Sequence, residues 1–132
     1  MYTETNSKTD MLRQVAKDYV LKGLGEKNFD NIPYDENVAL RAPFCPGGSA
    51  VPLIGKENLR TQWWAPLPSL LGSVTLIDTY VNEAQTAVTV EFHCEIIQPA
   101  CTLRTVDRFK INDDGRITEQ ENFLDPRAVT NP

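Results

Sequence analysis

The sequence contains a single histidine and three cysteines, Cys45, Cys94 and Cys101, among its 132 residues. The cysteines are odd in number and lack the CxxC spacing of a zinc site, which needs about four ligands. We therefore expect reduced thiols and no metal site.

The chain also lacks an excess of basic residues and any long apolar run. Lys and Arg total 13 against 18 Asp and Glu, which gives a net charge of −5. Nucleic-acid binders present a basic face to phosphates, so we expect no nucleic-acid partner. No stretch of about 18 apolar residues is present, so no membrane span is expected. The first ten residues have neither a basic nor an apolar segment of the kind found in secretion signals, and we predict a cytoplasmic protein.

What remains is the composition of an ordinary globular protein, with 41% hydrophobic and 23% charged residues. A chain of this length is long enough to bury a core, and we expect a single domain spanning residues 1–132.

Helical signals dominate the first half of the chain. Apolar residues recur at i, i+3, i+4, i+7, i+8 and i+12 in residues 7–28, which predicts a long amphipathic helix. A short helical turn at 26–32 and a brief helix at 56–64 are expected, with a strand at 36–44 between them. Two glycines and two prolines in residues 45–55 predict a loop, which we expect at a pocket rim.

Strand signals fill the second half. Alternating segments at 73–81, 86–97, 101–111 and 116–124 are separated by short turns, which favours antiparallel neighbours. Helices followed by such a meander predict an α+β fold, in which helices cover one face of a curved sheet.

The last hairpin carries an anomaly. A two-residue turn at Asp114-Gly115 would pair Arg108 with Glu121 and Lys110 with Glu119 on one face. The other face mixes polar and apolar side chains: Asp107, Phe109, Ile111, Gln120, Asn122 and Leu124.

Burying a carboxylate without partners costs several kcal/mol, so the polar members of this face need hydrogen bonds or water. In one interpretation Asp107, Gln120 and Asn122 satisfy one another beneath the helices. In the other they line a pocket that sheet and helices leave open. A carboxyl in an apolar pocket has a raised pKa, which suits a general acid or base.

Two segments carry a family resemblance: the Gly-Lys-Glu-led GKENLRTQWW and the final VDRFKINDDGRITEQENFLDP. With the order of elements, they resemble SnoaL-like domains of the nuclear transport factor 2-like superfamily. The resemblance implies a cone-shaped, curved antiparallel or mixed sheet wrapped around the long N-terminal helix plus two short helices. It also implies a deep apolar pocket, a homodimer through the outer sheet face, and no metal or organic cofactor.

Relatives in this superfamily include polyketide cyclases, ketosteroid isomerase and limonene-epoxide hydrolase, beside non-catalytic binders. In epoxide-hydrolase-like members, the third residue of the final-strand motif is a catalytic acid. Here QENFLD places Asn122 at that position, which counts against hydrolase chemistry. The Arg-x-Asp of the middle strand is also absent. We therefore expect Asp107 to be the acid or base, with Asn122 orienting a substrate oxygen.

Further residues are expected to bind the substrate. Tyr19 lies on the apolar helix stripe, where its side chain either packs in the core or turns its hydroxyl to the cavity. His93 is expected on the outer sheet face, because Phe92 and Cys94 belong to the apolar phase of their strand. The predicted lining set is Tyr19, Phe44, Trp63, Trp64, Tyr80, Phe92, Thr105, Phe109 and Gln120.

These expectations define a leading hypothesis and its alternatives. The protein holds a small hydrophobic molecule in a conical pocket, with an isomerase, cyclase or dehydratase activity that uses Asp107 and no cofactor. The alternatives are a non-catalytic ligand-binding module and a protein-interaction module.

Overall fold

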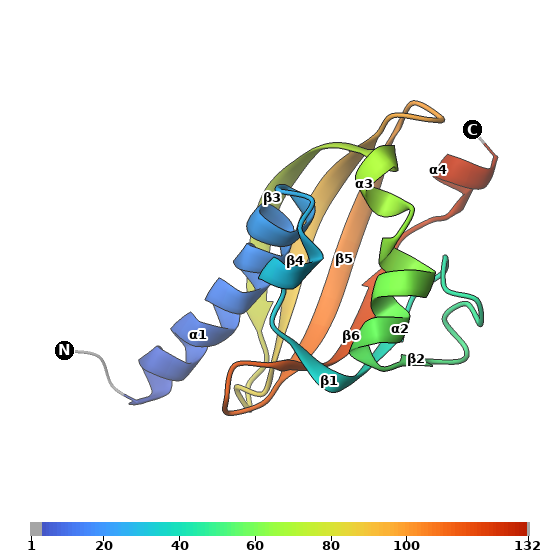
Figure 1. Cartoon of the computed structure of the whole chain (residues 1–132). Helices are drawn as coiled ribbons and strands as arrows, with labels where there is room; N and C mark the ends of the chain where they lie inside the picture. The colour runs from blue at the N-terminus through green and yellow to red at the C-terminus, as the bar shows by residue number, and fades with distance from the viewer. Residues whose placement is uncertain (1–3, 132) are drawn as a thin grey trace.

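The computed structural model describes residues 4–131, with side chains from residue 8 onward. A six-stranded mixed sheet curves around the N-terminal helix α1 (Glu4–Asp18), as Figure 1 shows. The strand order is β2-β1-β6-β5-β4-β3, and β1 runs parallel to β6 whereas the other neighbours are antiparallel. The strands are β1 (Tyr34–Arg41), β2 (Leu53–Ile54), β3 (Leu71–Val81), β4 (Ala87–Ile96), β5 (Cys101–Ile111) and β6 (Ile117–Phe123). The predicted α+β fold is confirmed.

Helix α1 forms where the apolar stripe predicted it, although it begins earlier, and it continues as a π-helical segment, Tyr19–Leu24. The stripe is the buried face, because those side chains leave water when α1 packs on β3 and β4. Its buried members are Leu12, Val15, Ala16, Tyr19, Val20 and Leu24.

The short helices lie over the sheet beside α1 (Figure 1). Helix α2 (Lys56–Leu59) continues as a π-helical turn to Trp64, as predicted, and a 3-10 turn forms at Phe29–Asn31. The sequence did not predict β2, α3 (Leu67–Leu70) or α4 (Arg127–Thr130). Pro68 falls in the first turn of α3, where its missing N–H removes no helical hydrogen bond.

The final hairpin has the predicted register along most of its length. Arg108 lies 3.3 Å from Glu121 and Lys110 lies 3.2 Å from Glu119 on the outer face. On the inner face Asp107 is paired with Asn122.

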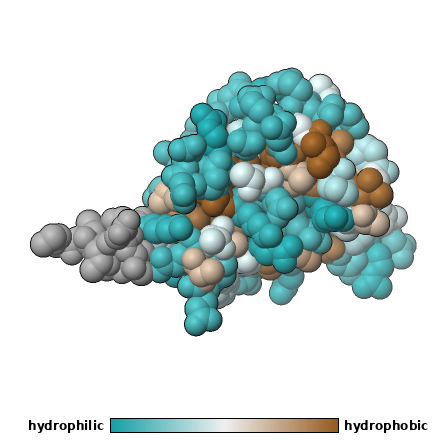
Figure 2. All heavy atoms as spheres, turned by 90° about the horizontal axis from the view of Figure 1, so that it is seen from below, coloured by the Kyte–Doolittle hydropathy of each residue, from teal (hydrophilic) through white to brown (hydrophobic). Residues whose placement is uncertain are grey.

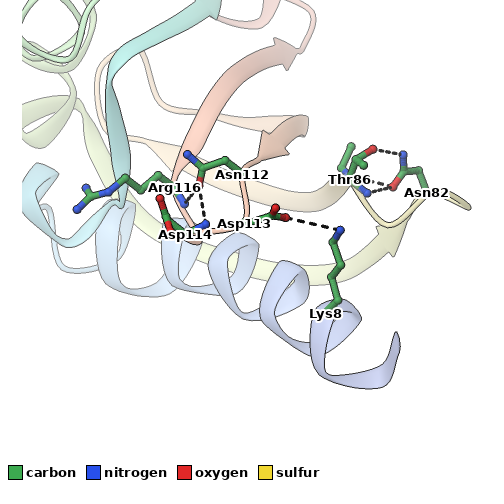
Figure 3. A network of polar contacts seen from close by, with 8 residues as sticks. Lys8, Asn82, Thr86, Asn112, Asp113, Asp114 and Arg116 are labelled. Carbon is green, nitrogen blue, oxygen red and sulfur yellow. Dashed lines mark hydrogen bonds and ion pairs between the residues drawn. The ribbon is translucent and has the colours of Figure 1, made fainter. Parts of the chain in front are cut away.

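The turn of this hairpin is longer than predicted. Figure 3 shows that Asn112 Oδ1 accepts hydrogen bonds from the backbone N–H groups of Asp114 and Arg116, each at 3.0 Å. The N–H of Gly115 donates to the Asn112 carbonyl, and Gly115 has a φ of +78°. The expected two-residue turn is therefore wrong, because the Asn112 side chain stabilises a three-residue tip. Ile111 consequently pairs with Ile117 rather than Thr118.

Strand β3 contains a bulge that reverses its faces. Leu76 pairs with Phe92, but Asp78 pairs with Glu91, so Ile77 is an extra residue. Leu76 therefore packs inward before the bulge, while Thr79 is buried after it. Tyr80 is turned to the outer face.

The end of the sheet that carries the β3–β4 and β5–β6 turns is mostly hydrophilic (Figure 2). Figure 2 views this end from below, and hydrophobic side chains surface there only in separate places. A Lys8–Asp113 ion pair of 3.8 Å joins α1 to the β5–β6 turn (Figure 3). Within residues 4–131, no helix has the length and apolar character needed to cross a membrane.

Candidate functional site

A cavity of about 260 Å³ lies between the inner sheet face and the short helices. Its wall includes residues of α3, α4 and the β4–β5 connection, which lie toward the end opposite the β3–β4 and β5–β6 turns (Figure 1). Most of the wall is apolar. The lining residues are Tyr19, Leu24, Phe44, Gln62, Trp63, Pro66, Leu67, Leu70, Leu71, Phe92, Cys94, Ile96, Gln98, Leu103, Thr105, Asn122, Leu124 and Val129.

Three polar side chains belong to the buried part of this wall: Tyr19, Thr105 and Asn122. Tyr19 comes from the π-helical end of the long helix, Thr105 from β5 and Asn122 from β6. Inward alternation along β5 and β6 brings the last two to the same surface. Polar groups on an otherwise apolar wall can fix the orientation of a bound molecule.

Asp107 lies behind this polar surface. Its side chain is 0% exposed and does not contribute to the cavity wall. Gln120 Nε2 donates a 3.0 Å hydrogen bond to Asp107 Oδ2, and Tyr34 donates its hydroxyl to Gln120 Oε1 at 2.5 Å. Asp107 Oδ1 accepts no hydrogen bond of ordinary geometry. A buried carboxyl oxygen without a donor favours the protonated acid.

The electrostatics of Asp107 agree with this geometry. Burial raises the pKa of Asp107 from 3.8 to about 7, and the nearby Asn122, Tyr19 and Gln120 side chains oppose the rise by interacting with the carboxylate. Burial, with Asp107 adding to it, also raises the pKa of Tyr19 and of Tyr34 well above 10. Asp107 therefore exchanges its proton near neutral pH, while the two phenols stay neutral.

Aromatic packing holds Tyr19 in place. Its ring lies 4.9 Å from the Phe109 ring and 6.1 Å from the Phe92 ring, both edge-on. Such contacts stabilise each pair by about 1 kcal/mol beyond burial. The ring of Tyr19 is thereby held at the cavity wall, with its side chain close enough to interact with Asp107 and Gln120.

The structure brings part of the predicted set to the cavity. Phe44 lies at the mouth with 42% of its surface exposed, whereas Phe92 and Trp63 are buried wall residues. Six of the expected residues line the cavity: Tyr19, Phe44, Trp63, Phe92, Thr105 and Asn122.

Four expected residues are buried but do not form the wall. Trp64 packs 5.5 Å from Phe29, and Phe109 supports Tyr19 from behind. Gln120 and Asp107 form the layer behind the polar wall, so their expected direct contact with a ligand is not what the structure shows. Here both interpretations of the hairpin anomaly hold in part, because Asp107 and Gln120 bond to each other while Asn122 lines the pocket.

Tyr80 was predicted to line the cavity, and this prediction is wrong. The bulge at Ile77 turns Tyr80 to the outer face, where it is 52% exposed and donates to Glu91 Oε1 at 3.2 Å. His93 also lies outside the cavity wall, as expected from strand alternation.

Sequence reasoning missed the contribution of the short helices. Leu67 and Leu70 of α3 and Val129 of α4 line the cavity. The i, i+3 spacing of the two leucines was the available signal, but a segment of four residues that follows Pro66 and contains Pro68 carries little periodicity. Cys94 also belongs to the wall, and burial raises the pKa of its thiol to about 12, so it stays neutral. Within residues 4–131, no three His, Cys, Asp or Glu side chains gather as metal ligands would.

The sequence matches no protein-family model and no curated protein. Solved structures are similar in fold. The protein RV0760c from Mycobacterium tuberculosis, in complex with estradiol-17β-hemisuccinate, superposes with a TM-score of 0.71 at 12% identity over 89% of this chain and 96% of its own.

Two further solved structures also have a fold similar to that of this chain. Δ5-3-ketosteroid isomerase from Mycobacterium sp. has a TM-score of 0.70 at 15% identity, with 89% of this chain and 95% of its own covered. An NTF-2-like protein of unknown function from Burkholderia xenovorans LB400 has a TM-score of 0.70 at 13% identity, with 89% and 84% covered. Likeness at such low identity concerns the fold alone.

Proposed function

This chain has the nuclear transport factor 2-like fold, and we propose that it binds a small, flat apolar molecule and moves a proton on it without a cofactor. The ligand presents one oxygen to Tyr19 and Asn122. The observation that best supports this proposal is that a buried carboxyl, Asp107, lies behind the polar part of an apolar cavity wall.

The cavity supports binding of a compact ligand. Its volume of about 260 Å³ is just below the roughly 300–1,000 Å³ of typical ligand pockets. Aromatic and aliphatic walls stabilise an apolar molecule by removing its surface from water. Similar structures include a complex with a steroid derivative and a ketosteroid isomerase, which makes a fused-ring ligand a reasonable class to test.

The polar layer supports proton transfer. Asp107 has a pKa of about 7, so its acid and base forms coexist under neutral conditions. Because Asp107 does not reach the cavity, we assign its exchange with the ligand to the hydroxyl of Tyr19, a wall residue whose side chain interacts with Asp107. Asn122 donates its amide N–H to the same ligand oxygen, which stabilises charge that develops there.

The test uses 2-tetralone, a flat ketone whose hydrogens beside the carbonyl exchange by proton transfer. In D₂O the wild-type protein should accelerate deuterium incorporation, followed by mass spectrometry. Asp107→Asn should abolish the acceleration and leave the Kd for 2-tetralone within about threefold, because the substitution is behind the wall. Tyr80→Phe, an outer-face change, is the matched control and should behave as wild type.

A second candidate function is ligand binding without catalysis. It is favoured by the complete burial of Asp107, which keeps the carboxyl from touching a ligand directly. Tight binding of 2-tetralone with no exchange in the wild type would select this candidate. An absence of binding as well would contradict both.

We also propose a homodimer formed through the outer sheet face. Ile77, Tyr80 and Phe123 expose 46%, 52% and 44% of their surfaces there. These side chains lie on β3 and β6 at the two sides of this face, and a second subunit packed on the face would remove them from water.

A further inference from the structure

A buried chain of hydrogen bonds leads from the Asp107 carboxyl to Gln120 and Tyr34. Tyr34 of β1 donates to Gln120 of β6, which donates to Asp107 of β5, over distances of 2.5 and 3.0 Å. The three side chains are 0%, 2% and 0% exposed. None of the three forms the cavity wall, so contact with a ligand does not account for this chain.

The orientation of the Gln120 amide assigns the donors and acceptors in this chain. The Tyr34 hydroxyl donates to Gln120 Oε1, so the amide oxygen of Gln120 is occupied by Tyr34. The amide nitrogen, which can only donate, therefore faces Asp107 Oδ2. A proton on Oδ2 that pointed toward Gln120 would face the N–H group of the amide, and two donors form no hydrogen bond with each other. Oδ2 is thus restricted to accepting.

The other oxygen of the carboxyl is left for the acidic proton. Asp107 Oδ1 is buried and has no hydrogen-bond partner. Tyr19 and Asn122, the two wall residues beside Asp107, both interact with its carboxyl. A proton on Oδ1 gives the otherwise unpaired oxygen a donor function toward the hydroxyl of Tyr19.

We infer that Tyr34 and Gln120 are positioning residues that hold the acidic proton of Asp107 on Oδ1, so that it enters the site through Tyr19. This inference rests on the proposed function and adds its direction of proton flow. The Oδ1–H bond breaks as a new O–H bond forms on Tyr19, and Tyr19 passes its own hydroxyl proton to the ligand oxygen. A water molecule in the cavity takes the proton that leaves the carbon beside the carbonyl, so that the ketone becomes an enol. Asp107 is left as the carboxylate, with Oδ2 still bonded to Gln120, and the reverse transfer restores it.

The surroundings of Asp107 make its protonation sensitive to this chain. The titratable groups that face it are Tyr19 at the end of the long helix, Tyr34 on β1 and Cys94 on β4, and all three stay neutral near pH 7. The N–H of Gln120 lowers the pKa of Asp107 by stabilising the carboxylate. Without Tyr34, the amide is free to rotate and present its oxygen, which stabilises the acid instead.

The experiment is a pH titration of Asp107 in the ligand-free protein, read from the ¹³C shift of its labelled side-chain carboxyl. Tyr34→Phe and Gln120→Leu should each raise the midpoint by about 0.5–1 pH unit, the size expected for one ordinary hydrogen bond. Tyr80→Phe removes an outer-face hydroxyl that also bonds a carboxylate, and it should leave the midpoint unchanged.

A double variant separates positioning from a general loosening of the core. Tyr34 acts only through Gln120, so Tyr34→Phe should shift the midpoint by less than about 0.2 unit when Gln120→Leu is already present. Equal shifts in both backgrounds, or no shift in Tyr34→Phe alone, would overturn the inference. Tyr34→Phe keeps the ring and so decides the matter even if Gln120→Leu does not fold.

The titration needs no ligand, so its outcome is independent of the proposed function. Coupled shifts without deuterium exchange in the wild type would retain the positioning of the proton and refute catalysis. If exchange occurs, its pH profile should move with the Asp107 midpoint in Tyr34→Phe.

Discussion

Asp107 and Asn122 are direct partners across β5 and β6, yet only Asn122 lines the cavity. Tyr19 covers Asp107 from the side of the helix and itself forms part of the wall. The carboxyl is thus shielded from water while remaining one side chain away from a ligand. This arrangement supports an acid or base that acts through a neighbour.

Replacing Asp107 should change how stability depends on pH. The pKa of Asp107 is about 7 in the folded protein against an ordinary value of 3.8, so between these two pH values the folded state binds a proton that the unfolded state releases. The free energy of unfolding therefore falls as pH rises from 4 to 7, by at most about 4 kcal/mol from this group. Asp107→Asn should lose that decline. Urea unfolding of both proteins at pH 5, 6, 7 and 8 measures it.

The control for this prediction is Asp113→Asn at the hairpin turn, whose side chain is 98% exposed. It should keep the decline of the wild type. Parallel pH curves for the wild type and Asp107→Asn would show that Asp107 is ionised in the folded protein at pH 5.

Filling the cavity should remove ligand binding with little loss of stability. Cys94→Phe projects a ring from β4 into the cavity, where space is available. The affinity for 2-tetralone should fall at least tenfold, measured by calorimetry. Val90→Phe is the matched control, since Val90 lies on the same buried face of β4 but away from the cavity.

That control should unfold more easily, because overpacking a filled core costs about 1–3 kcal/mol. If Cys94→Phe is as destabilised as Val90→Phe, the space beside Cys94 is not free in solution.

The β5–β6 turn should depend on Gly115. Its φ of +78° is strained for any residue with a Cβ, while the nearest atom to such a Cβ, the sulfur of Met11, is at an ordinary 3.8 Å. Gly115→Ala should therefore lower the free energy of unfolding by about 1 kcal/mol through backbone strain alone. Binding of 2-tetralone should not change, because no residue of the turn lines the cavity. A loss of binding would mean that this end communicates with the cavity.

The outer sheet face should control the oligomeric state. Phe123 is 44% exposed beside Arg108, whose guanidinium lies 5.7 Å from the ring. Phe123→Arg adds a second cation there and should convert the proposed dimer to a monomer in sedimentation velocity at micromolar concentration. Gln62→Arg, at the cavity rim, should leave the dimer intact. A monomeric wild type would contradict the proposed interface.

The hairpin was the best-predicted element because its signals are local. The register follows from residues close together in the sequence. These are the alternating side chains of β5 and β6 and the opposite-charge pairs Arg108–Glu121 and Lys110–Glu119. The length of the tip escaped prediction because the Asn112 side chain adds two hydrogen bonds that stabilise a three-residue turn, in which Gly115 takes the positive φ.

The sheet face on which Tyr80 lies could not be predicted from the local sequence. The alternation of β3 places Tyr80 on the same face as Leu76, but the single extra residue Ile77 reverses that face. A bulge depends on how two strands match in length and curvature, which the sequence of one strand does not contain.

The amino-acid sequence by itself determined the long amphipathic helix, the main strands, most of the hairpin register and the presence of a carboxyl on an apolar face, because each depends on neighbours in the chain or on the periodicity of apolar residues. Only the tertiary structure decided that Asp107 is absent from the cavity wall, that Tyr19 belongs to it, and that residues of α3 and α4 complete it. Those positions depend on how a curved sheet and several helices share volume, a balance among contacts far apart in the sequence.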